Sequence, residues 1–293
     1  MPAFGYEDSG LIKAADGTRL FYGVAGDGPP CLLLDGVGCD GWAWNLIQPH
    51  LRSTHRTIHC HYRGHGRSGA LVDPTRNDIT DLADDAYRVL DHLEVEQTIV
   101  VAHSMGTQVA LEMVRTSADR IGAMILICGS SGEVTHTFHG NDLLHRILPT
   151  LIEKVDRYRP LARALWGRLP PALSYKIAAM IGEIDGPTIK AEDFQQYVEH
   201  LSDIELDLYL AMLQRAGDHS AEDLLPTIDI PTLVVAAERD TFTPPETVQK
   251  LADEIPDAHY VELAGASHAA PLERASAINA HIDDFLSELG AAR

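Results

Sequence analysis

The chain has few cysteines and shows no paired metal-binding or redox spacing among them. Its four cysteines, Cys31, Cys39, Cys60 and Cys128, form no CxxC pair. Three of the four lie in apolar stretches, where a free thiol usually behaves as a small buried hydrophobe. The cysteine pattern therefore indicates a reduced, cytoplasmic setting.

Basic residues are also scarce, since 23 Lys and Arg stand against 43 Asp and Glu, for a formal net charge of −20. Such a surface repels nucleic acid and anionic membranes, so we expect neither as a partner. No apolar stretch approaches the ~20 residues of a membrane span, and no secretory signal is expected from the first residues. The 45% apolar and 23% charged residues are typical of a globular protein.

The remaining residues predict an alternation of strands and helices. A hairpin is expected around the Asp16-Gly17 turn, and helices are expected at about 79–93, 105–117 and 275–289. Short apolar runs typical of strands lie at 19–24, 31–34, 57–60, 98–102, 123–128, 232–236 and 260–263. This alternation predicts an α/β fold with a mostly parallel sheet and helices on both faces.

The alternation is interrupted between about Ser131 and Pro226. This stretch has no convincing strand and several helical segments separated by prolines. We therefore predict a core domain from residues 1–130 and 227–293, with an all-helical cap at 131–226. The cap is expected over the carboxyl edge of the sheet, where open α/β sheets bind their ligands.

The strongest chemical signal is a serine between a predicted strand and a predicted helix. Ser104 is flanked at two positions on either side by Ala102 and Gly106, which matches the G-x-S-x-G turn with one extra methyl group. Small residues are needed there because the strand and helix backbones crowd together. The alternative is a serine that only caps the helix N-terminus, but the placement favours a nucleophile.

A serine hydroxyl is a poor nucleophile unless a base lies within hydrogen-bond reach. Asp240 follows the strand at 232–236 and His268 follows the strand at 260–263, which gives the order Ser, Asp, His. All three residues then lie at the same edge of the sheet. We predict Ser104 as nucleophile, His268 as general base and Asp240 as the group that orients this base.

These residues resemble those of the α/β-hydrolase fold superfamily, in its lid-bearing branch of esterases, lactonases, carbon–carbon bond hydrolases and cofactor-free perhydrolases. The resemblance covers nearly the whole chain and includes the stretches 35–38 and 63–68, with Pro244 and Glu273. It implies an eight-stranded sheet, an oxyanion hole formed by the backbone N–H groups of Val37 and Met105, and no metal or organic cofactor. Haloalkane dehalogenases and epoxide hydrolases of this fold have Asp at the position of Ser104, so their chemistry is disfavoured. Carbon–carbon hydrolases often have Trp after the catalytic His, where this chain has Ala269.

The chain departs from the family pattern at two positions. Relatives usually have His-Gly at the start of the oxyanion loop and Asp in an Asp-x-Arg-Gly stretch, whereas Asp35 and His61 occupy those places here. An unpaired carboxylate there would oppose the negative charge that develops on the substrate. We therefore predict that Asp35 and His61 interact, directly or through one water, and shape the loop. The alternative is that both face backbone donors or solvent. Asp35, Gly36, His61 and Gly106 are thus supporting residues.

Other candidates have simpler interpretations. His103 is interpreted as a neighbour of Ser104 that packs or hydrogen-bonds. Surface positions are favoured over a metal site for His136, His139 and His145, and a solvated helix face is predicted for Asp81, Asp84, Asp85 and Asp91. About two of the aromatic residues of the cap are expected to line the pocket, out of Phe138, Tyr158, Trp166, Tyr175, Phe194, Tyr197 and Tyr209.

The expected function is hydrolysis of a carboxylic ester or lactone with an apolar acyl part, through an acyl-enzyme on Ser104. The substrate would be a small molecule. Two alternatives remain open: the same three residues acting on a carbon–carbon bond or with peroxide, and a ligand-binding protein with little turnover.

Overall fold

The computed structural model describes residues 4–132, 134–137, 142–165, 175–176, 184–185, 188–189 and 191–291. These residues form one eight-stranded sheet with the strand order β1-β2-β4-β3-β5-β6-β7-β8. The strands are β1 (Asp8–Lys13), β2 (Arg19–Ala25), β3 (Pro30–Leu34), β4 (Arg56–Cys60), β5 (Thr98–His103), β6 (Ile121–Ile127), β7 (Thr232–Ala237) and β8 (His259–Leu263). The predicted α/β fold and its eight-stranded sheet are confirmed.

The sheet is mostly parallel. β1 and β2 form the predicted antiparallel hairpin, and Gly17 in its turn has φ +90°, a conformation that L side chains rarely adopt. β2 also pairs antiparallel with β4, whereas every later pair is parallel. The carboxyl ends of β3, β5, β6, β7 and β8 therefore meet at one edge.

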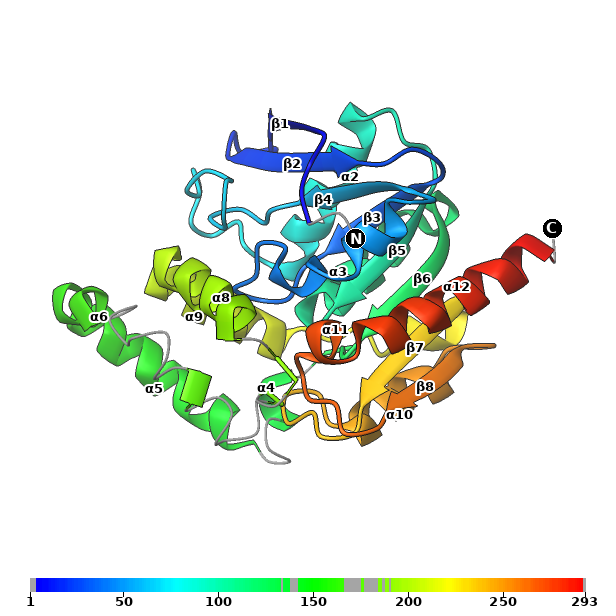
Figure 1. Ribbon diagram of the computed structural model, residues 1–293. Coiled ribbons are helices and arrows are strands. Elements are labelled where there is room, and N and C mark those ends of the chain that lie inside the picture. The colour runs from blue at the N-terminus through cyan, green and yellow to red at the C-terminus, as the bar shows by residue number, and fades with distance from the viewer. Residues whose placement is uncertain are drawn as a thin grey trace.

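Helices pack on both faces of the sheet (Figure 1). One face is covered by α2 (Ile79–His92), α3 (Met105–Ser117) and α10 (Pro245–Glu254). The other face is covered by α1 (Gln48–Leu51), α11 (Ala270–Glu273), α12 (Ala275–Ala291) and the short 3-10 helix η1 (Trp42–Trp44). Within β3, Leu32 and Leu34 are buried against the first layer and Cys31 and Leu33 against the second. This two-sided burial explains the continuous apolar runs of the central strands.

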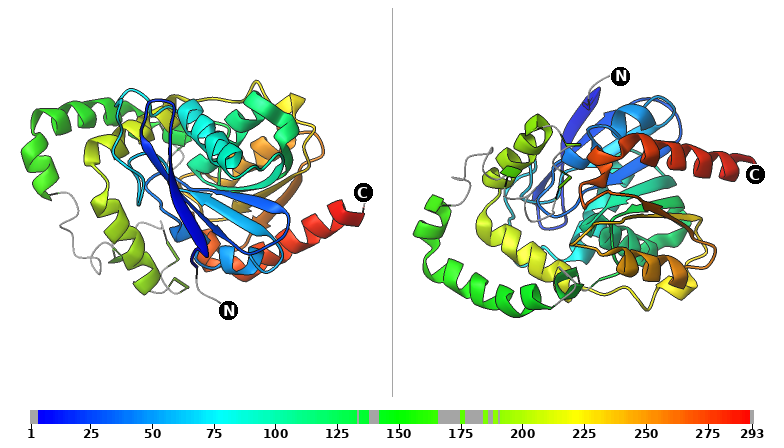
Figure 2. Two further views of the ribbon diagram at one scale, coloured as in Figure 1. Left: turned by 90° about the horizontal axis from the view of Figure 1, so that it is seen from above. Right: turned by 60° about the horizontal axis from the view of Figure 1, so that its bottom comes forward.

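The segment between β6 and β7 contains only helices and one isolated β-bridge, Gly132 with Ser220, among its described residues. Its helices are α4 (Val134–Thr137), α5 (Leu143–Arg157), α6 (Arg159–Leu165), α8 (Ala191–Asp203), α9 (Leu206–Asp218) and the 3-10 helix η4 (Leu225–Thr227). Figures 1 and 2 show α5, α6, α8 and α9 together beyond one end of the sheet, away from the C-terminal end of α12. Another 3-10 helix, η2 (Ala118–Arg120), joins α3 to β6.

Burial in the core also determines the state of the cysteines. All four are free and buried, whereas the sequence predicts this for the three that lie in apolar stretches. Burial raises the pKa of the Cys31 and Cys60 thiols to about 12, so these thiols are poor nucleophiles.

Across the described part of the chain, no helix is both long and apolar enough to cross a membrane.

Candidate active site

Ser104 occupies a strained turn between β5 and α3. Its φ and ψ are 55° and −124°, a combination that a residue with a side chain adopts only when its surroundings enforce it. Its N–H donates to the Ile127 carbonyl on β6, 3.0 Å away. A Cβ at Gly106 would lie 2.3 Å from the carbonyl oxygen of Leu34, so only glycine fits where α3 passes the end of β3. The turn therefore holds the serine at the carboxyl edge of the sheet.

Of the two predicted partners, His268 contacts this serine and Asp240 contacts His268. Nε2 of His268 is 2.9 Å from Oγ of Ser104, and Nδ1 of His268 is 2.8 Å from Oδ2 of Asp240. Because a carboxylate only accepts, Nδ1 carries the proton and the lone pair of Nε2 faces the serine hydroxyl. The arrangement has the geometry in which an imidazole can take the proton of a serine hydroxyl.

The Asp240 carboxylate is buried but fully hydrogen-bonded. Oδ1 accepts the backbone N–H groups of Phe242 at 2.8 Å and Thr243 at 2.9 Å. Oδ2 accepts the Thr243 hydroxyl at 2.8 Å in addition to His268. These donors replace the water that the charge loses on burial. The sequence analysis missed Thr243, although an Asp followed at three residues by Thr is a common side-chain-bonded turn.

The loop that carries His268 is fixed from two sides. Nε2–H of His103 donates to the carbonyl oxygen of His268 at 3.0 Å, so His103 is the hydrogen-bonding neighbour that was predicted. Burial, together with the nearby His268, lowers the pKa of His103 to about 4, so this imidazole stays neutral near pH 7. On the other side, Glu273 accepts the N–H of Ser267 at 2.7 Å and its hydroxyl at 2.6 Å.

The two amides expected to bind an oxyanion border the same space as the serine. Val37 and Met105 both line the cavity at Ser104, and no backbone hydrogen bond joins either N–H to another described residue. Gly36 lets the loop approach closely, since a Cβ there would lie 3.1 Å from Cβ of Ser104. The loop after β3 and the first residue of α3 thus bring both residues to the space beside Ser104.

Asp35 contacts a different histidine from the one predicted. Its Oδ2 lies 2.7 Å from Nε2 of His59, while His61 bonds to the Arg67 N–H through Nδ1 and to the Tyr6 hydroxyl through Nε2. The prediction was an interaction of Asp35 with His61 directly or through one water, and no direct hydrogen bond joins the two side chains. The alternative of backbone donors is met in part, because Asp35 accepts the N–H of Gly41 and His61 accepts that of Arg67. His59 and His61 lie two residues apart where β4 ends, and only the earlier one reaches the carboxylate.

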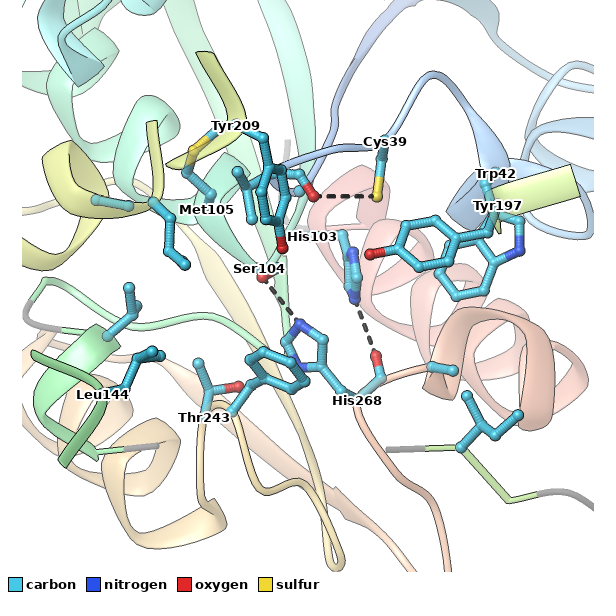
Figure 3. A pocket seen from close by; sticks show the side chains of 18 of the residues that line it. Cys39, Trp42, His103, Ser104, Met105, Leu144, Tyr197, Tyr209, Thr243 and His268 are labelled. Atoms are coloured by element: carbon cyan, nitrogen blue, oxygen red, sulfur yellow. Dashed lines mark hydrogen bonds between the residues drawn. The ribbon is translucent and has the colours of Figure 1, made fainter. Parts of the chain in front are cut away.

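A cavity of about 200 Å³ opens at Ser104 (Figure 3). Figure 3 shows Ser104 and His268 facing each other, with the Tyr209 ring directly above Ser104 in this view and the Trp42–Tyr197 pair at the right. No Asp, Glu, Lys or Arg is among its described lining residues. Three of the aromatic residues considered line it, Phe194, Tyr197 and Tyr209, whereas Phe138 and Trp166 lie outside the described residues. The described part of the lining is thus apolar and without charged side chains apart from the groups at the serine.

No group of three or more His, Cys, Asp or Glu side chains is arranged to hold a metal ion within the described ranges. Of the three histidines considered at the start of the helical segment, His139 and the side chain of His136 lie outside these ranges. Nδ1 of His145 lies 3.4 Å from Oγ1 of Thr135.

The fold and the serine at the sheet edge are those of an α/β-hydrolase, and sequence comparison agrees. The chain belongs to the alpha/beta hydrolase family, whose family model matches residues 32–281.

Relatives and solved structures match most of the chain's length. RutD from Azorhizobium caulinodans, named provisionally as a carbamate hydrolase, is 28% identical over 276 residues, which cover 92% of this chain and 96% of RutD. The 2-hydroxymuconate semialdehyde hydrolase of Pseudomonas sp. strain CF600 is 27% identical over 289 residues, with coverages of 95% and 94%. A thermophilic esterase from Thermogutta terrifontis superposes with a TM-score of 0.75 at 24% identity, covering 96% of this chain and 98% of the esterase. The last similarity demonstrates the shared fold.

Proposed function

We propose that this hydrolase cleaves an uncharged carboxylic ester or lactone with an apolar acyl part, through an acyl-enzyme on Ser104. The observation that carries the proposal is the contact series from Ser104 Oγ to His268 at 2.9 Å and from His268 to Asp240 at 2.8 Å, at one end of an apolar cavity. Every group needed for acyl transfer lies at this end.

The proposed reaction has two steps. His268 takes the hydroxyl proton as Ser104 attacks the carbonyl carbon, and the N–H groups of Val37 and Met105 stabilise the oxyanion. His268 then passes its proton to the leaving alkoxide, and the ester bond breaks to leave an acyl-serine. Water attacks the acyl-serine while His268 accepts its proton. His268 then returns this proton to Oγ of Ser104 as the acyl–Oγ bond breaks and the acid is released. Asp240 keeps the imidazole in the required tautomer throughout.

The described lining, which includes no Asp, Glu, Lys or Arg, supports a neutral substrate. A carboxylate placed among these apolar side chains would lose its hydration without gaining a cationic partner, which costs several kcal/mol. The name of the Pseudomonas relative denotes a substrate with a carboxylate, and that feature fits this cavity poorly. Ester or lactone hydrolysis is therefore favoured over carbon–carbon cleavage of such an acid.

The helices between β6 and β7 complete this proposal as a cap. Leu144 on α5, Phe194 on α8 and Tyr209 on α9 line the cavity opposite residues that follow the core strands. We assign these helices the role of enclosing the acyl group and limiting its length.

A matched pair of substrates tests the proposal. p-Nitrophenyl butyrate and p-nitrophenyl hemisuccinate share the leaving group and have four-carbon acyl parts, but the second carries a carboxylate. We expect turnover of the butyrate and a kcat/KM at least about a hundredfold lower for the hemisuccinate. No turnover of butyrate, acetate or a simple lactone, with binding alone, would instead support the ligand-binding alternative.

A further inference from the structure

A buried chain of hydrogen bonds runs beneath the oxyanion loop. It begins at the backbone N–H of Arg67 and continues through the side chains of His61, Tyr6, His59 and Asp35, in that order. The distances are 2.9 Å from Arg67 N to His61 Nδ1, 3.2 Å from His61 Nε2 to the Tyr6 hydroxyl, 2.6 Å from this hydroxyl to His59 Nδ1 and 2.7 Å from His59 Nε2 to Asp35 Oδ2. The side chains of Asp35, His59 and His61 are all buried.

The direction of this chain is fixed at both ends. A backbone N–H only donates, so Nδ1 of His61 accepts from Arg67. Burial, with His59 next in effect, lowers the pKa of His61 to about 2, so its single proton is on Nε2 and is donated to Tyr6. At the other end the Asp35 carboxylate only accepts, so Nε2 of His59 donates to it. The Tyr6 hydroxyl then donates to Nδ1 of His59, and every proton meets an acceptor.

The last residue of this series of hydrogen bonds, Asp35, closes the oxyanion loop. The Asp35 carboxylate also accepts the backbone N–H of Gly41, at 3.0 Å from Oδ2 and 3.3 Å from Oδ1. This contact joins the two ends of the segment that carries Gly36 and Val37, directly beside Ser104. The backbone carbonyl of Asp35 is held as well, by the Tyr62 hydroxyl at 2.9 Å.

We propose that Tyr6, His59 and His61 are positioning residues that orient the Asp35 carboxylate toward Gly41 and thereby set the position of the Val37 amide. The inference rests on the proposed function, because it assigns the Val37 amide to the oxyanion. These residues touch no substrate and act only through the loop. Removing one of these side chains displaces the Val37 N–H, which stabilises the transition state more than the bound substrate. The removal therefore lowers kcat while leaving KM nearly unchanged.

The test compares two tyrosines that each bond to a histidine. Tyr6→Phe removes the central hydroxyl of the chain, whereas Tyr22→Phe removes the hydroxyl that lies 3.1 Å from Nε2 of His92, on the face of the sheet covered by α2. We expect Tyr6→Phe to lower kcat for p-nitrophenyl butyrate about tenfold with KM within about twofold, and Tyr22→Phe to leave both unchanged. In the Tyr6→Phe/His61→Gln double variant, the second substitution adds little because the chain is already broken.

Two further measurements do not depend on ester turnover. Hydrogen exchange at the Gly41 amide should accelerate in Tyr6→Phe and not in Tyr22→Phe, and phosphonylation of Ser104 should slow about tenfold in Tyr6→Phe alone. If the unsubstituted protein hydrolyses no ester, the proposed function fails, whereas the Gly41 exchange still tests the positioning. Equal effects of Tyr6→Phe and Tyr22→Phe would overturn the inference, as would unchanged Gly41 exchange or an effect confined to KM.

Discussion

Replacing Asp240 by asparagine changes one atom, and the structure determines which way the new amide points. Oδ1 of Asp240 accepts two backbone N–H groups, from Phe242 and Thr243. An NH₂ group at this position would meet two donors, so the asparagine oxygen must stay there. The NH₂ group therefore takes the place of Oδ2 and faces Nδ1 of His268.

This orientation inverts the tautomer of the imidazole. The amide donates to Nδ1 of His268, so the proton moves to Nε2, which then faces Ser104 as a donor and cannot take its proton. Thr243 adapts without cost, because its hydroxyl also lies 2.8 Å from the carbonyl oxygen of Cys128 and can donate there. We expect kcat to fall about 10³- to 10⁴-fold, while the free energy of unfolding changes by about 1 kcal/mol or less.

The assay measures kcat and KM for p-nitrophenyl butyrate together with urea unfolding. Asp223→Asn is the matched control, since this exposed carboxylate bonds to Arg115 in the last turn of α3, at the opposite end of that helix from Ser104, and should leave kcat unchanged. A kcat for Asp240→Asn within about tenfold of the unsubstituted protein would refute the reasoning. A large loss of stability that accounts for the lost activity would refute it as well.

Three further predictions concern packing, specificity and pH. Gly106→Ala should destabilise the fold by about 2 kcal/mol or more and abolish activity, whereas Gly290→Ala, with no atom within 4 Å of the new Cβ, should stabilise it by about 0.5–1 kcal/mol in urea unfolding. Leu213→Phe narrows the cavity and should lower kcat/KM for p-nitrophenyl octanoate at least about tenfold relative to the acetate; equal losses for both esters would contradict this role. Burial lowers the pKa of His65 to about 4, so below about pH 6.5 the unfolded chain binds a proton that the folded chain excludes, and stability falls as the pH drops toward 4. Between pH 6 and 5, His65→Gln should reduce the slope of unfolding free energy against pH by the equivalent of about one bound proton, whereas a substitution of the exposed His259, His259→Gln, should not. Identical slopes for His65→Gln and the unsubstituted protein would exclude His65 as a source of this pH dependence.

The fold was predictable because its sheet is buried on both faces. Each central strand is a short apolar run, and α3 begins and ends where the periodicity and the elbow motif place it. Ser104, Asp240 and His268 were found by the same rule, since each follows a strand whose carboxyl end lies at one edge of the sheet.

Side-chain partners could not be predicted in the same way. His59 and His61 are equally plausible partners for Asp35 from sequence spacing, and both also bond to the Tyr6 hydroxyl, which comes from a distant part of the chain. The acidic residues of α2 show the same limit. A solvated face was predicted for them, and Asp84 and Asp91 are indeed exposed. Asp85, however, is buried and bonds to the Arg63 guanidinium at 2.7 and 2.8 Å, with Oδ1 and Oδ2 each accepting one N–H. Asp81 is buried too and completes the N-terminal capping box of the helix with Asp78.

The central claim is that Ser104 is a nucleophile activated by His268. The most direct measurement is the mass of the protein after incubation with a fluorophosphonate, followed by peptide mapping, for the unsubstituted chain and for Ser104→Ala. The claim predicts one added phosphonyl group, located on the peptide that contains Ser104, and no addition to Ser104→Ala. An unlabelled protein, a label on another residue, or equal labelling of Ser104→Ala would contradict it.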